Sequence, residues 1–96
     1  MSRERRAFER LQIPDDALAL DDAGTELGRI SQAGGGGMLI HTGSEKAAAA
    51  FQAGQHLRIT VLEPRTNNRH TLRVVVRYRT GEAVGVEFLG QLPRHA

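Results

Sequence analysis

Three arginines near the start of the chain have the type and the spacing to bind an anion. Arg6 and Arg10 stand four residues apart, and Arg5 precedes the first of them. A guanidinium is a fixed fork of donors that matches phosphate oxygens, or the O6 and N7 edge of a guanine, in a bidentate manner. By itself this spacing is more often that of a solvated basic leader than that of a ligand clamp.

A second group of residues with possible chemistry stands near position 30. Ser31 and Gly34 lie three residues apart, and Gly34 begins a run of four glycines that ends at Gly37. No regular element favours four consecutive glycines. The run must therefore serve backbone freedom, either a positive φ or room for another group to approach the main chain closely.

Composition limits the classes of protein to which the chain can belong. Its 96 residues, 40% of them hydrophobic and 25% charged, predict one globular domain. The absence of cysteine excludes disulfides and thiolate metal sites. The histidines at 41, 56, 70 and 95 show no metal-ligand spacing, so no metal or other cofactor is expected. The charged N-terminus and the lack of an apolar run of ~20 residues predict a cytoplasmic protein without membrane insertion.

Alternating apolar and polar residues predict six short strands and one helix. The expected strands are 17–20, 25–31, 38–41, 56–63, 71–79 and 83–89. The helix is expected over 44–51, with Ser44 as its N-cap and Gly54 after its end. Six close strands without a βαβ rhythm predict a small antiparallel barrel or two packed sheets, and closure would remove exposed edges.

The same alternation predicts which side chains face the core. Tyr78 shares its register with Leu72, Val74 and Val76, and we expect it to pack inside rather than stack on a base. The paired aspartates at 15–16 and 21–22 are interpreted as turn formers. No pattern places a base beside Ser31, so it is not expected to act as a nucleophile.

The order of these motifs resembles the PilZ domain, a small bacterial β-barrel that serves as a receptor for cyclic di-GMP. The resemblance runs from about Arg5 to Leu89. It includes an R-x-x-x-R pair before the first strand, Ser31-x-x-Gly34 from the family's D/N-x-S-x-x-G motif, and Gly85-x-x-Phe88 in the last strand. It implies a mainly β fold, a six-stranded PilZ-type barrel with one short helix. The expected organisation is a flexible arm over 1–10, the barrel over 11–90 and a frayed tail over 91–96.

The resemblance also implies roles for the matching residues. Arg6 and Arg10 would cover cyclic di-GMP and pair with its phosphates and guanine edges, while Arg5 would add long-range attraction. Ser31 would make one hydrogen bond, and Gly34 would let the ligand rest on bare backbone.

One position departs from the family pattern, because Arg29 stands where the motif has aspartate or asparagine. An arginine has donors only, so it cannot accept a hydrogen bond from a guanine edge. Each guanine N–H left unpaired would cost about 1–3 kcal/mol. Arg29 could instead turn toward a phosphate or the O6 and N7 edge of guanine.

Three functions remain open at this point. The first is a non-enzymatic receptor for cyclic di-GMP that signals to an unidentified protein partner, in control of motility, biofilm adhesion or exopolysaccharide production. It would act as a monomer or a ligand-linked dimer. The second is a degenerate PilZ domain that binds no nucleotide and serves as a protein-interaction adaptor, which Arg29 favours. The third, a binder of single-stranded nucleic acid, is disfavoured because the chain has one tyrosine and three phenylalanines to offer as stacking platforms.

Overall fold

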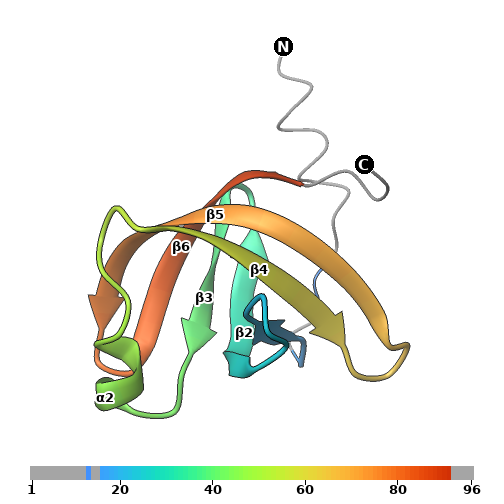
Figure 1. Cartoon of the computed structure of the whole chain (residues 1–96), viewed down its shortest axis with the longest axis horizontal. Coiled ribbons are helices and arrows are strands. Elements are labelled where there is room, and N and C mark those ends of the chain that lie inside the picture. The colour runs from blue at the N-terminus through green and yellow to red at the C-terminus, as the bar shows by residue number, and fades with distance from the viewer. Residues whose placement is uncertain (1–12, 14–15, 92–96) are drawn as a thin grey trace.

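The computed structural model describes residue 13 and residues 16–91, and this part of the chain forms a closed antiparallel barrel (Figure 1). The strands are β1 (Leu18–Leu20), β2 (Glu26–Gly34), β3 (Gly37–His41), β4 (His56–Glu63), β5 (Asn68–Thr80) and β6 (Ala83–Gln91). They close in the order β1-β2-β3-β6-β5-β4. With the short helix α2 (Glu45–Ala48), this confirms the predicted mainly β fold. Across the described residues, no helix is long and apolar enough to cross a membrane.

The barrel is filled by the inward residues of the alternating strands, as the sequence predicted. The largest fully buried side chains are Ile30, Ile40, Ile59, Leu72, Val61, Val74, Val76 and Val84. Burying each such side chain stabilises the fold by about 1.5–3 kcal/mol. The segment that contains α2 covers one end of the barrel, where Ala48 and Phe51 join the core (Figure 1). Ser44 is confirmed as the N-cap, since its Oγ accepts a hydrogen bond from the Ala47 N–H at 3.0 Å.

The turn between β1 and β2 is built by an aspartate, which bears out the interpretation of Asp21 as a turn former. One carboxylate oxygen of Asp21 accepts hydrogen bonds from the N–H groups of Ala23 and Thr25, at 2.9 and 2.8 Å. Gly24 takes a φ of +86°, which an L side chain rarely adopts. The side chain of Asp22 points elsewhere and pairs with Arg58.

The glycine run forms the tight turn between β2 and β3, and it uses both kinds of backbone freedom that the sequence predicted. Gly35 has a φ of +59°. Gly37 lies so close to β6 that a methyl group on it would come within 2.3 Å of the Val86 carbonyl oxygen. Before the turn, the register of β2 shifts between Ser31 and Gly34, which is a β-bulge.

The prediction that Tyr78 packs in the core is wrong. The register of β5 against β6 shifts between Val76, opposite Val86, and Tyr78, opposite Gly85. This bulge adds Arg77 to one strand only, and the alternation of side chains reverses after it. Tyr78 consequently points outward with 51% of its surface exposed.

Candidate functional site

The predicted site residues of the barrel lie on the outer wall of β2 and β3. Strand pairing places Ser31 opposite Leu39 and Arg29 opposite His41. These four residues alternate with Ile30 and Ile40, which are fully buried inside, so all four side chains project outward. We call this set, Arg29, Ser31, Leu39 and His41, the β2–β3 face.

A hollow of about 560 Å³ opens on this face, lined by Asp16, Arg29, Ser31 and Gln32. Asp16 reaches it because the chain before β1 continues the antiparallel pairing with β2. Leu18 is opposite Arg29, and the Ala17 carbonyl accepts a hydrogen bond from the Ile30 N–H at 2.9 Å. The next residue back, Asp16, therefore comes beside Ser31.

Asp16 is a site residue that the sequence interpretation missed, because the aspartates at 15–16 were interpreted only as turn formers. Its carboxylate is 52% exposed and lies 3.7 Å from the Nε of Arg65, whose side chain is 88% exposed. Such an exposed pair is weak and leaves the carboxylate free to accept other hydrogen bonds. Its place beside Ser31 follows from the pairing of Leu18 with Arg29, a register that the sequence pattern alone does not give.

Ser31 has a partner that the sequence did not reveal. Its Oγ lies 2.7 Å from Nε2 of His41, and which atom donates depends on the tautomer of the ring. The expectation that no base stands beside Ser31 is therefore wrong. A nucleophilic serine also needs a third group that orients its histidine, and no carboxylate among the described residues bonds to His41. The bond instead fixes the direction of the Ser31 hydroxyl on the face.

Arg29 brings unused donors to the same hollow. Its side chain is exposed, and within the described part of the chain it makes no hydrogen bond or ion pair. Asp16, beside Ser31 on the paired segment, thus offers acceptors, and Arg29, two residues before Ser31 on β2, offers donors. A ligand that carries both an anionic group and N–H donors could use both.

Gly34 lies on a second, smaller hollow that adjoins the first. This hollow measures about 240 Å³, and its lining includes Gly34, Gly37, Leu39 and Tyr78. Gln32 lines both hollows, which makes them neighbours on the wall. The structure therefore brings Arg29, Ser31 and Gly34 to one continuous surface. Arg5, Arg6 and Arg10 fall outside the described residues, so their part in the site stays a prediction.

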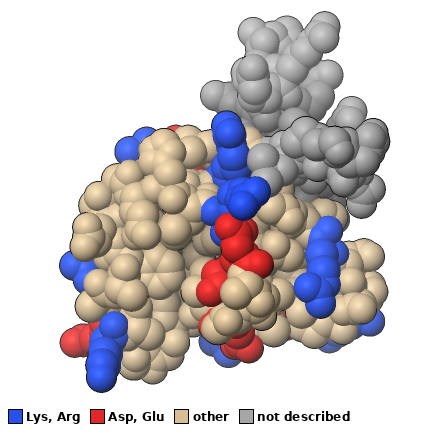
Figure 2. All heavy atoms as spheres, in the orientation of Figure 1, with Lys and Arg blue, Asp and Glu red and all other residues tan. Residues whose placement is uncertain are grey.

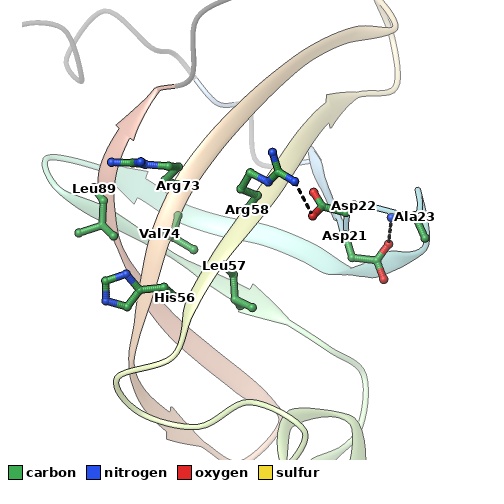
Figure 3. A pocket seen from close by; sticks show the side chains of 9 residues that line it. All are labelled: Asp21, Asp22, Ala23, His56, Leu57, Arg58, Arg73, Val74 and Leu89. Carbon is green, nitrogen blue, oxygen red and sulfur yellow. Dashed lines mark hydrogen bonds and ion pairs between the residues drawn. The ribbon is translucent and has the colours of Figure 1, made fainter.

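A larger hollow lies elsewhere on the described barrel and carries none of the predicted site residues. It measures about 860 Å³ and runs beside β4, with Arg58, Leu57 and His56 on its wall (Figure 3). The close-up shows that three of its charged side chains are engaged, since Arg58 Nη2 lies 3.1 Å from Asp22 Oδ2 and Asp21 bonds to the turn, whereas Arg73 has no such partner among the described residues. The candidate site is therefore assigned by the position of Ser31 and its neighbours Asp16 and Arg29, and not by the size of the hollow.

The charge pattern of the β4–β5 side does not favour nucleic-acid binding on that face. Figure 2 shows basic side chains directly beside acidic ones in the middle of that face, and the remaining basic side chains are scattered. A continuous basic stripe, which a nucleic-acid backbone would require, is not visible there. In the described residues, no cluster of three or more histidine or acidic side chains could hold a metal ion.

A closed six-stranded antiparallel barrel with one short helix places the chain in the class of small all-β barrel domains. The family model of the PilZ domain matches residues 4–95. The chain therefore belongs to the PilZ family, whose members are receptors and adaptors for cyclic di-GMP and are generally without enzymatic activity. Searches of curated proteins and of solved structures return no match.

Proposed function

We propose that this PilZ domain is a non-enzymatic receptor that binds cyclic di-GMP on the β2–β3 face and passes the signal to a protein partner. The observation that carries the proposal is the hollow in which Asp16, Arg29 and Ser31 meet. It lies where the family's serine motif falls in this chain, and its polar groups are open to solvent.

Asp16 supplies the hydrogen-bond acceptor that Arg29 lacks. A guanine presents N–H donors that need an acceptor, and the aspartate or asparagine of the family motif is replaced here by a residue with donors only. The Asp16 carboxylate lies beside Ser31, on the segment that pairs with β2, and can accept those bonds. Arg29 is then free to pair with a phosphate, to which a guanidinium binds in a bidentate manner.

The arginines before the barrel complete the site. Arg6 and Arg10 would cover the ligand, with phosphate and guanine edges as their targets, and Arg5 would add attraction at longer range. Ordering of this segment over the ligand would change the surface offered to a partner protein. Such an order–disorder step is a common form of molecular switch.

Calorimetry with cyclic di-GMP tests the proposal on matched aspartates. Asp16→Ala removes the acceptor, and we expect its Kd to rise about 5- to 150-fold, since unpaired guanine donors cost ~1–3 kcal/mol. Asp22→Ala removes another exposed, ion-paired aspartate that does not line this hollow and should leave the Kd unchanged. Equal affinities of the wild type and Asp16→Ala would show that the carboxylate is not the acceptor.

The alternative, an adaptor that binds no nucleotide, is favoured by one observation, the arginine at position 29. It predicts no heat from the wild type. Arg29→Asp restores the family residue at this position, so under this alternative it should generate binding where the wild type has none. Under our proposal the wild type binds already, and Arg29→Asp weakens the interaction, because it removes the guanidinium that pairs with a phosphate.

A further inference from the structure

The outward turn of Tyr78 creates a flat aromatic surface beside the proposed ligand site. Its ring lies over Gly85, where a methyl group would come within 2.4 to 2.8 Å of the Cζ, Cε2 and Cε1 atoms. The ring therefore packs directly on the backbone at Gly85, and any larger residue at this position would displace it. Half of the Tyr78 surface stays open to solvent.

This surface lies in one row with Ser31. The pairings Ser31 to Leu39, Leu39 to Gly85 and Gly85 to Tyr78 run straight across β2, β3, β6 and β5. Since neighbouring strands are about 4.8 Å apart, the ring above Gly85 stands roughly 10 Å from Ser31. That separation is within the reach of one dinucleotide.

The hollow beside the ring suits a planar group. It measures about 240 Å³, below the roughly 300 Å³ at which pockets for drug-sized ligands begin, so it fits one ring system. The turn glycines Gly34 and Gly37 line it without side chains. Arg77 lines it too, and its guanidinium is held by Glu87, with Nε and Nη2 each 2.5 Å from Oε1. A cation at a fixed place near an open aromatic face favours a purine, which stacks through its ring and presents acceptor atoms at its edge.

We propose that Tyr78 is the stacking platform for a purine base, seated in the hollow between its ring and the glycine turn. The inference rests on the proposed function and extends it. One base of cyclic di-GMP is read at Asp16, Arg29 and Ser31, and the other stacks on Tyr78. Stacking gives affinity, while the bonds at Asp16 give the preference for guanine.

Tyrosine emission can report this contact directly, because Tyr78 is the single tyrosine of the chain and there is no tryptophan. Cyclic di-GMP is titrated into the wild-type chain while calorimetry and tyrosine emission are recorded together. We expect the emission to be quenched with the same Kd that calorimetry gives. Tyr78→Leu should raise that Kd about 5- to 150-fold, the range for loss of one base stack. Tyr78→Phe keeps the ring and should leave the Kd unchanged.

The outcomes separate this inference from the function on which it rests. Heat of binding with no change of emission, and with an unchanged Kd for Tyr78→Leu, would overturn the stacking platform and leave the receptor intact. No heat from the wild type would overturn both. Because the quenching is measured on the wild type, a Tyr78→Leu chain that failed to fold would not remove the test.

Discussion

Replacement of Gly37 by alanine should destabilise the barrel more than any other alanine in the glycine run. The added methyl group would stand 2.3 Å from the Val86 carbonyl oxygen, whereas real Cβ atoms essentially never come closer than 3.0 Å. β3 and β6 would have to separate by at least 0.7 Å, the difference between these distances, at the point where Gly37 pairs with Glu87. The obstructing atom belongs to the backbone, so no side-chain rotation can relieve the clash.

The size of the effect follows from two terms. Overpacking costs about 1–3 kcal/mol, and weakening one hydrogen bond between the strands adds about 1 kcal/mol. A total of about 2–4 kcal/mol would lower the Tm of a domain of this size by roughly 8–30 °C. This is a large share of the ~5–15 kcal/mol by which small domains are stable.

Urea denaturation and thermal melting measure the loss of stability in Gly37→Ala, and Gly36→Ala is the matched control. A methyl group at Gly36 meets nothing within 4 Å, and the φ of this residue is not positive. It should be neutral or stabilise by up to about 1 kcal/mol through the unfolded state. Gly35→Ala has space but a φ of +59°, and it should cost about 1–2 kcal/mol. Equal stability of Gly37→Ala and Gly36→Ala would refute the close approach of β3 to β6.

Further substitutions test the turn, the core and the helix cap, each by the midpoint of urea denaturation. Asp21→Ala should lose about 1–2 kcal/mol because it leaves the Ala23 and Thr25 N–H groups without their acceptor, whereas Asp22→Ala removes only an exposed ion pair and should lose less than about 1 kcal/mol. Ile40→Ala should lose about 2–5 kcal/mol, because the side chain is fully buried. Ser44→Ala should lose about 1 kcal/mol with its capping bond to Ala47. A loss for Asp22→Ala as large as that for Asp21→Ala would contradict this account of the turn.

Local patterns were sufficient to predict the elements of the fold. Alternation marked β4 with its bounds at His56 and Glu63, and it marked the centres of the other strands. The cap at Ser44 and the turn after Asp21 follow from short-range hydrogen bonds, which involve residues within four positions of each other. β6 continues beyond the expected Leu89 to Gln91, a difference at a strand end where polar residues give little signal.

The site was predicted less completely, because its neighbours are set by strand register. His41 lies beside Ser31 because β3 pairs with β2, and Asp16 lies beside it because the chain before β1 continues the pairing with β2. No local pattern reveals either pairing. The β-bulge at Arg77 adds a single residue to β5 and reverses the side of Tyr78. A period-two interpretation has no means of detecting such an insertion.

The position of cyclic di-GMP on the barrel is the central claim, and amide chemical shifts during a titration test it most directly. We expect the largest shifts at the N–H groups of residues 29–35 and of Tyr78, and none at α2, which lies at the far end of β3 from the glycine turn (Figure 1). Saturating shifts confined to the β2–β3 face and its row to Tyr78 would support the account. Shifts centred on the hollow beside β4, or no shifts with the ligand in large excess, would contradict it.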